Sequence, residues 1–515
     1  MTLASCVRRV RDGSFDPLAA YSVLCDEGRR ADSALFETGA VKSRRAERSI
    51  VMSEAALRLE GKGRAARAIP LDAAGVVLVD RLVAALAPDP ACAVSRDADG
   101  ATFGWPPLDG DAEERARLKQ PGPLDAVRAL VAAVEVFDST GASDDGPLLP
   151  CAFRYDFVES LETLPEGRGD AARPDFVFWV PAAGLEIHHV DGRVCAFARD
   201  VDPARAEARA TALLQTAESA SYGPPPAPAN AVEADVDLDD EAFAERVRTV
   251  QEEIAKGNVY QAVPSRSFRT PCAEPLAAYA RLRTSNPSPY LFFLNFGDAI
   301  LFGASPETCL KVEPDGTASL HPLAGTRPRG RTADGAVDPE RDARFEAELR
   351  LSTKETAEHM MLVDLARNDL ARVCAPGSRR VTRLLEVERF SRVMHLGSTV
   401  EGTLDEAWDA LHAYAASANM GTLVGAPKLE ATALLRRIEH DRRGWYGGAV
   451  GFFKADGAFE TAIVIRSAVV EDGVACVRAG AGVVEHSDPA AEADETRRKA
   501  QAVLEALGAR EAAHA

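Results

Sequence analysis

The sequence lacks the features that mark several large classes of protein. None of its nine cysteines forms a CxxC pair, which excludes a zinc ribbon or a thioredoxin-like redox motif. Charged residues interrupt every apolar run before it reaches membrane-spanning length, and the first residues, MTLASCVRRVRDGSFD, include no signal-peptide stretch. The net charge of -19 argues against a nucleic-acid or anionic-membrane partner. We therefore expect a cytoplasmic protein with reduced, mostly buried cysteines.

The length and one break in composition indicate two lobes. A chain of 515 residues exceeds what one hydrophobic core usually supports, which is about 250 to 300 residues. Residues 223–228 (GPPPAP) and the acidic stretch at residues 233–241 are typical of a linker. We predict a regulatory or supporting lobe over residues 1–222, a linker over 223–240 and a catalytic lobe over 241–510.

Strand and helix signals come in blocks, and no GxGxxG or GxxxxGK[ST] loop follows a βαβ pattern. This organisation predicts an α+β fold with antiparallel sheet. In the first lobe we expect strands around residues 33–39 and 175–180, with a helix over 126–137. In the second lobe we expect a single long helix over 346–373 and a second helix over 492–507.

Two pairs of glutamates have a spacing that suits a metal. Glu355 with Glu358, and Glu492 with Glu495, each fall at i and i+3, so each pair shares one face of its predicted helix. Four carboxylates from two helices suit Mg2+, a hard ion that prefers oxygen ligands. The alternative is that both pairs lie on solvated faces, and spacing alone favours this alternative because glutamate pairs are common on helices.

Three other patterns have simple alternatives. Residues 462–470 (AIVIRSAVV) resemble one apolar strand in which Arg466 needs an ion-pair partner or a ligand. The glycines in AGAG at residues 479–482 suit either a close backbone approach to a ligand or a tight turn. Pairs of arginines, such as Arg436 with Arg437, are most simply solvated helix surface.

A series of motifs, in constant order between residues 240 and 508, resembles the chorismate-utilising enzyme family, and within it the first component of anthranilate synthases. The motifs are NPSPYLFFL (286–294), LFGASPE (301–307), PLAGTRPRG (322–330), HMMLVDLARNDLARVCAPGS (359–378), VMHLGS (393–398), GAPK (425–428), RRGWYGGAVG (442–451), IRSA (465–468), AGAGVV (479–484) and EADET (492–496). A weaker likeness extends through the first lobe. The resemblance implies antiparallel β-sheets packed as a sandwich surrounded by helices, and conversion of chorismate and ammonia to anthranilate and pyruvate.

Three positions separate the activities of this family. Relatives that add water carry a lysine where this chain has Gln261, and an amide cannot deprotonate water. Relatives that make 4-amino-4-deoxychorismate have a nucleophilic lysine where this chain has Ala324. His395 matches the histidine linked to pyruvate elimination. These residues favour ammonia as nucleophile and anthranilate as product.

The resemblance also implies roles for individual residues. Glu307 would protonate the departing C4 hydroxyl, His395 would remove the C2 proton, and Gln261 and Thr326 would complete the catalytic group. Glu358 and Glu495 would bind Mg2+, with Glu355 and Glu492 supporting them. The substrate-binding residues would be Thr422 and Lys499 at the ring carboxylate, and Tyr446, Arg466, Gly480, Ala481 and Gly482 at the pyruvyl carboxylate.

The chain departs from the family pattern at several positions. Val424 stands where a serine or threonine usually precedes GAPK, which removes a hydroxyl near the expected ring-carboxylate site. Residues 151–156 (CAFRYD) lack the glycines common there. Thr38, Leu291 and Phe452 replace a usual serine, methionine and tyrosine of the regulatory region.

Feedback inhibition by tryptophan is a further expectation from the resemblance. Glu37 and Thr38 would meet the ammonium group of tryptophan, and Pro289, Tyr290 and Leu291 would pack its indole ring; the alternative is a core strand that ends in a turn. A glutamine amidotransferase subunit would supply ammonia, in a heterotetramer with two of each chain, since no GxCxGxQ glutaminase motif occurs. The competing hypotheses are a 2-amino-2-deoxyisochorismate synthase of a secondary pathway and a non-catalytic, tryptophan-sensing homologue.

Overall fold

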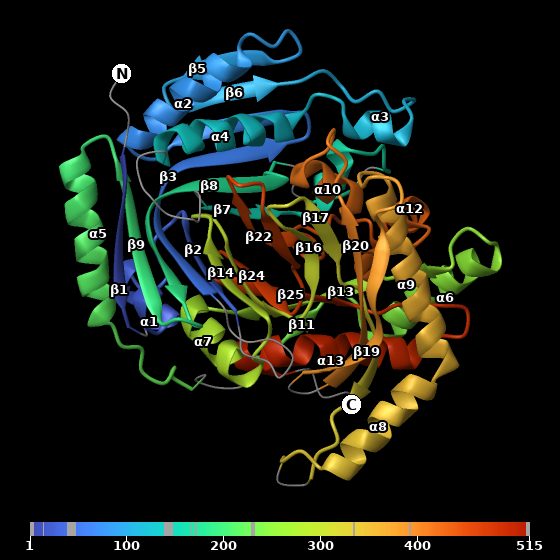
Figure 1. The fold of residues 1–515 in the computed structure, drawn as a ribbon. Helices are drawn as coiled ribbons and strands as arrows, with labels where there is room; N and C mark the ends of the chain where they lie inside the picture. Colours follow the sequence, from blue (N-terminus) through green and yellow to red (C-terminus); the bar gives the residue numbers. More distant parts are fainter. Residues whose placement is uncertain are drawn as a thin grey trace.

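The computed structural model describes residues 5–13, 15–38, 48–138, 148–165, 167–169, 172–227, 232–332, 335–390 and 393–510. Antiparallel strands fill the centre of the molecule and helices surround them (Figure 1). This arrangement confirms the predicted α+β class with antiparallel sheet. No helix within the described ranges is long and apolar enough to cross a membrane.

The elements before the predicted linker are mostly strands. The strands are β1 (Ser5–Asp12), β2 (Ser33–Glu37), β3 (Arg48–Lys62), β4 (Ala65–Pro70), β5 (Ala93–Asp97), β6 (Gly100–Gly104), β7 (Leu148–Phe153), β8 (Phe176–His188) and β9 (Arg193–Asp200). The helices are α1 (Pro17–Leu24), α2 (Ala73–Leu86), α3 (Glu114–Leu118), α4 (Pro123–Asp138) and α5 (Pro203–Glu218), with a 3-10 turn at Tyr155–Ser160. The strands expected near residues 33–39 and 175–180 are β2 and β8, and the expected helix over 126–137 is α4.

The rest of the chain combines shorter strands with longer helices. The strands are β10 (Val232–Glu233), β11 (Asp235–Val236), β12 (Gln261–Ala262), β13 (Ser265–Pro271), β14 (Tyr290–Asn295), β15 (Ile300–Ser305), β16 (Thr308–Val312), β17 (Thr317–Leu320), β18 (Leu323–Pro328), β19 (Arg380–Arg389), β20 (Val393–Thr403), β21 (Gly425–Ala426), β22 (Ala449–Lys454), β23 (Phe459–Ile463), β24 (Ser467–Glu471), β25 (Val474–Gly480) and β26 (Ala509–Arg510). The helices are α6 (Asp240–Ala255), α7 (Pro275–Ser285), α8 (Pro339–Leu351), α9 (Thr353–Ala371), α10 (Ala410–Ser417), α11 (Gly421–Val424), α12 (Lys428–Glu439) and α13 (Pro489–Leu507).

Strands from the two sides of the predicted linker pair with each other. β2 pairs with β14, and β7 pairs with β22, both antiparallel. The two predicted lobes therefore share one hydrogen-bonded sheet network. Residues 228–231 of the predicted linker lie outside the described residues, and β10 and β11 fall in its second half.

The prediction of one continuous helix over residues 346–373 is wrong. α8 ends at Leu351 and α9 begins at Thr353, with Ser352 between them. The Ser352 hydroxyl accepts a hydrogen bond from the backbone N–H of Glu355 at 3.3 Å, so it caps the first turn of α9. The break places Glu355 in that first turn, next to β18.

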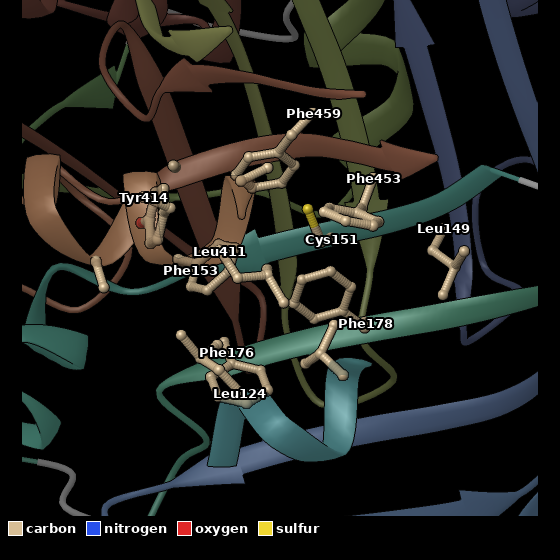
Figure 2. Packing of buried hydrophobic residues seen from close by; sticks show 14 of the residues in the cluster. Leu124, Leu149, Cys151, Phe153, Phe176, Phe178, Leu411, Tyr414, Phe453 and Phe459 are labelled. Carbon is tan, nitrogen blue, oxygen red and sulfur yellow. The ribbon is translucent and has the colours of Figure 1, made fainter. Parts of the chain in front are cut away.

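Aromatic side chains from both parts of the chain form the largest core cluster. Phe153 of β7 lies edge-on to Phe178 of β8, with ring centroids 5.5 Å apart, and its ring is 4.1 Å from that of Tyr414 on α10. Figure 2 shows these rings together with Phe453 and Phe459 of β22 and β23. Apolar burial therefore fixes β7 and β8 against the segments that lie near the candidate site.

Candidate active site

The acidic pairs of α9 and α13 lie close enough to influence each other. Burial, together with the charges of Glu355, Glu492 and Glu495, raises the pKa of Glu358 to about 7 against the opposing effect of Lys354. The structure therefore brings together the four carboxylates whose spacing suggested one site. Glu492 is buried and the other three are half-buried, so neither pair lies on a fully solvated face.

Cationic side chains currently hold most of these carboxylates. Arg327 donates to Glu355 Oε1 at 2.8 Å, and Lys499 Nζ lies 2.6 Å from Glu495 Oε1. Glu358 Oε1 is buried without a hydrogen-bond partner among the described residues, and Lys354 Nζ lies 3.8 Å from it. Across the described part of the chain, no three carboxylate, histidine or cysteine side chains are arranged to hold a metal. Basic side chains thus lie next to Glu355, Glu358 and Glu495, where the metal was expected.

Glu307 lies in the turn between β15 and β16 and is buried. Burial raises its pKa to about 8, although a hydrogen bond from the Thr422 hydroxyl at 2.9 Å and the charge of Lys499 act in the opposite direction. The carboxyl is therefore mostly protonated at neutral pH. A protonated carboxyl in a buried site is suited to donate a proton to a leaving group.

His395 lies on β20, where Thr326 of β18 and Glu388 of β19 are its cross-strand neighbours. Its Nδ1 lies 3.2 Å from the carbonyl oxygen of Gly325 and 3.0 Å from the Thr326 hydroxyl. Because a carbonyl only accepts, Nδ1 carries the proton and Nε2 keeps its lone pair. Burial, followed by the charges of Arg466 and Lys499, lowers the pKa of His395 to about 4. The imidazole is neutral at pH 7 and is suited to act as a base.

Arg466 does not lie within a strand, as the sequence suggested, but at a corner between two strands. β23 ends at Ile463 and β24 begins at Ser467, and Arg466 has a positive φ of 51°. One of its Nη atoms donates to the carbonyl oxygen of Lys499 at 2.8 Å. The corner satisfies part of the guanidinium, which a position inside an apolar strand would have buried unpaired.

The glycine-rich segment at the end of β25 lies against the other predicted substrate-binding residues. Lys499 Nζ donates to the carbonyl oxygen of Gly480 at 2.9 Å. A Cβ at Gly480 would lie 2.7 Å from the Pro264 carbonyl oxygen and 3.0 Å from the Tyr446 hydroxyl. Only glycine permits this close packing against the Pro264 carbonyl and the Tyr446 hydroxyl, and a close approach of this backbone to a ligand stays a prediction.

Gln261 reaches the same segment from β12. A Cβ at Gly482 would lie 2.8 Å from Gln261 Nε2, and Gln261 Oε1 is buried without a hydrogen-bond partner among the described residues. β12 pairs with β21, which places Gln261 opposite Ala426 of the GAPK motif. The fully buried Ala481 packs in the same apolar cluster as Val424.

Val424 is fully buried in that cluster, among residues such as Phe243 and Leu434. Its side chain thus contributes to the core, and its carbonyl accepts a hydrogen bond from the Val263 backbone N–H at 3.0 Å. The neighbouring Thr422 supplies the hydroxyl that meets Glu307. The valine in place of a hydroxyl residue therefore leaves this contact intact.

The residues expected to bind tryptophan meet at the β2–β14 pairing, where Glu37 lies opposite Leu291. The Glu37 carboxylate is buried and accepts from the Tyr279 hydroxyl at 3.0 Å and from Arg283 Nε at 2.8 Å. The Thr38 hydroxyl donates to the Arg48 carbonyl at 2.8 Å. Both carboxylate oxygens are therefore already engaged.

The apolar part of the expected inhibitor site follows the same strand. Pro289 and Leu291 are buried, and the Tyr290 hydroxyl lies 2.8 Å from that of Thr308. The described chain does not include residues 39–47, which follow Thr38.

Two basic side chains of the α12 region have partners that the sequence did not indicate. Arg436 is buried rather than solvated, and it donates to Asp156 and Glu159 at 2.8 and 2.6 Å. The signal was its position on the buried face of α12, one turn after Thr432. Lys428 of GAPK is bonded to Asp369 of α9 at 2.7 Å, which fixes α12 against the helix that carries the first acidic pair.

The described cysteines are free, and all are buried except the half-buried Cys476, as expected. Cys6 has a side chain outside the described set.

The comparisons place these features in a known class of protein. Residues 99–505 match the family described as chorismate binding enzyme, so the chain belongs to that family. It is 47% identical over 492 residues to the pyocyanine-specific anthranilate synthase component 1 of Pseudomonas aeruginosa, covering 93% of this chain and 91% of the relative. It is 43% identical to anthranilate synthase component 1 of Escherichia coli K12, covering 98% and 97%.

A solved structure has the same fold. Anthranilate synthase component I from Streptococcus pneumoniae superposes with a TM-score of 0.70 at 26% identity, covering 90% of this chain and 94% of that one. These findings confirm the family resemblance and the fold that the motifs indicated.

Proposed function

We propose that this chain is the synthase component that converts chorismate and ammonia to anthranilate and pyruvate in tryptophan biosynthesis. The observation that carries the proposal is that, at neutral pH, the expected acid is protonated and the expected base is neutral. The pKa of Glu307 is raised to about 8 and that of His395 is lowered to about 4. The charge of Lys499 lowers the pKa of both groups, which supports a shared site near its ammonium group.

The first step adds ammonia at C2 of chorismate and expels the C4 hydroxyl. The lone pair of ammonia forms the new C–N bond, and Glu307 supplies the proton with which the hydroxyl leaves as water. Gln261 has no basic group, and ammonia needs none, because neutral ammonia is already a good nucleophile whereas water must first lose a proton. The product of this step is 2-amino-2-deoxyisochorismate.

The second step forms the aromatic ring. His395 Nε2 removes the C2 proton, the C–H electrons form the new ring double bond, and the C3–O bond to the side chain breaks. The departing enol takes up one proton at its methylene carbon, which balances the proton removed from C2, and becomes pyruvate. The neutral state of His395 and the acceptor-only Gly325 carbonyl at its Nδ1 support this role. Thr326 would hold the imidazole in the same orientation.

The cations and glycines of the site suit a substrate with two carboxylates. Thr422 and Lys499 would hold the ring carboxylate. Arg466, whose planar fork matches a carboxylate, would hold the pyruvyl carboxylate with Tyr446 and the backbone at residues 480–482.

We propose Mg2+ as the cofactor, held by Glu358 and Glu495, with Glu355 and Glu492 acting through water. Glu358 Oε1 is buried without a hydrogen-bond partner among the described residues, and the charges of Glu355, Glu492 and Glu495 act on its pKa, which suits a hard divalent cation. When bound, the ion would neutralise charge on the ring carboxylate. Glu495 would exchange its ion pair with Lys499 for the metal, which leaves the ammonium group available to the substrate.

The proposal includes partners and regulation. A glutamine amidotransferase subunit would deliver ammonia in an assembly of two chains of each kind, and the name component 1 of the relatives supports a second component. Tryptophan would act as the feedback inhibitor at Glu37, and the enzyme would work in the cytoplasm.

Purified protein with chorismate, Mg2+ and ammonium tests the function. We expect anthranilate fluorescence and pyruvate in equal amounts. Accumulation of 2-amino-2-deoxyisochorismate, formation of isochorismate or a 4-amino product, or no turnover would each overturn the proposal.

A further inference from the structure

A buried guanidinium contacts the segments that carry Thr422 and Gln261 of the candidate site. Arg443 follows α12, and only 2% of its side chain is exposed. Its Nε and one Nη donate to both oxygens of Glu439, at 2.8 and 2.7 Å. The Nη atoms also donate to the carbonyl oxygens of Leu423 and Val263, at 2.7 and 2.6 Å. One planar group therefore joins three separate segments.

Two of these segments carry residues of the candidate site. Leu423 directly follows Thr422, whose hydroxyl bonds to Glu307. Val263 lies two residues after Gln261, just beyond β12. The Arg443 guanidinium also lies 5.8 Å from the centre of the Tyr446 ring.

Glu439 compensates the buried positive charge of Arg443. Its Oε1 also accepts from the backbone N–H and the hydroxyl of Ser265, at 2.8 and 2.7 Å, and its Oε2 accepts from Arg478 at 2.9 Å. Burial alone would raise the pKa of Glu439, but the charges of Arg443 and Arg478 lower it to about 2. The carboxylate is thus ionised and fully bonded.

We propose that Arg443 is a positioning residue that fixes the Thr422 turn and the Gln261 strand relative to each other for the addition of ammonia. The inference rests on the proposed function. A lysine at this position has one nitrogen on a flexible stem, so it cannot reproduce the four hydrogen bonds that three guanidinium nitrogens make to Glu439, Leu423 and Val263. Without the guanidinium, the segments of Thr422 and Gln261 lose the group that joins them, although every side chain expected to touch the substrate is still present.

The same geometry predicts that the second step is spared. His395 is carried by β20 and held by Gly325 and Thr326 of β18. None of the hydrogen bonds described for Arg443 reaches β18 or β20. A lysine also keeps a cation near Tyr446, so the pyruvyl end of the substrate retains its environment.

The experiment compares Arg443→Lys with Arg436→Lys. Arg436 is also buried and lies on the adjacent α12, but it donates to Asp156 and Glu159 rather than to site segments. For each protein, kcat is measured with chorismate and ammonium, and separately with supplied 2-amino-2-deoxyisochorismate. Circular dichroism and the melting temperature record the fold.

We expect Arg443→Lys to lower kcat from chorismate on the order of a hundredfold, which is the cost of about 1 Å of misplacement. Its kcat from the amino intermediate should stay within about twofold of wild type. Arg436→Lys should change neither rate by more than the same factor. Equal losses in both steps for Arg443→Lys, or equal behaviour of the two variants, would overturn the positioning role.

Two further outcomes keep the proposal separate from the proposed function. If the wild-type protein does not aminate chorismate, the proposed function fails whatever the variants do. If Arg443→Lys does not fold, Glu439→Gln carries the same test, because the amide removes the charge that orients the fork. A folded Glu439→Gln with unchanged amination would then overturn the inference.

Discussion

Replacing Glu307 by glutamine tests two properties of this carboxyl: its role as a general acid and the effect of its burial on the stability of the fold. The amide keeps the shape and can still accept from Thr422, but it has no proton to donate. We expect kcat to fall by about 10² to 10⁴, the usual contribution of a general acid. Because the wild-type acid must be protonated, wild-type kcat should decline above about pH 8, the pKa of Glu307.

The same raised pKa has a consequence for stability. A carboxyl whose folded-state pKa exceeds its ordinary value stabilises the fold fully below that ordinary value, and this stability is lost as pH rises through the folded pKa. For Glu307 the interval runs from 4.5 to about 8. At about 1.4 kcal/mol per pH unit, the wild type should lose about 5 kcal/mol of unfolding free energy that the glutamine variant retains.

Thermal unfolding across pH 5 to 9 measures this difference. At roughly 1 °C per kcal/mol for a chain of this length, the melting temperature of Glu307→Gln should rise relative to wild type by about 5 °C and level off above pH 8. Glu241→Gln is the matched control, because that side chain is 86% exposed and loses the same charge. A difference for Glu307→Gln that does not depend on pH would refute the argument from burial.

Four other outcomes can be measured on the same protein. Glu358→Gln and Glu495→Gln should each abolish turnover at saturating Mg2+ without changing the circular dichroism spectrum, because the hard ion loses an oxygen ligand; near-normal rates at low Mg2+ would exclude these residues as ligands. His395→Met should let amination continue while the amino intermediate accumulates on chromatography, whereas loss of both steps would show a wider role. Tryptophan at millimolar concentration, about 4 kcal/mol of binding, should slow turnover, since it must displace Arg283 from Glu37, and Glu37→Gln should remove the effect; an unchanged rate would mean that this site does not bind it. Ammonium, but not glutamine, should support turnover by this chain alone, and glutamine-dependent activity would contradict the need for a partner.

The local sequence was sufficient for many of the elements and for the family. The i, i+3 glutamates lie on one face of a helix whatever the rest of the fold does, because the helical repeat fixes them. Apolar strands such as β2 and β8 were also visible from composition alone. The order of the motifs indicated the family, and the resemblance implied the roles of Glu307, His395 and the acidic pairs.

The tertiary structure decided how those residues behave. No sequence pattern reveals that Glu307 is buried far enough to stay protonated, because its desolvation comes from segments distant in the chain. Arg436 resembled solvated surface until the packing of α12 against residues 155–160 was known. The break at Ser352 depended on a capping hydrogen bond that competes with helix continuation. Sequence determines short-range geometry, whereas burial and charge partners come from long-range contacts, and these set the pKa values and the positions on which the chemistry depends.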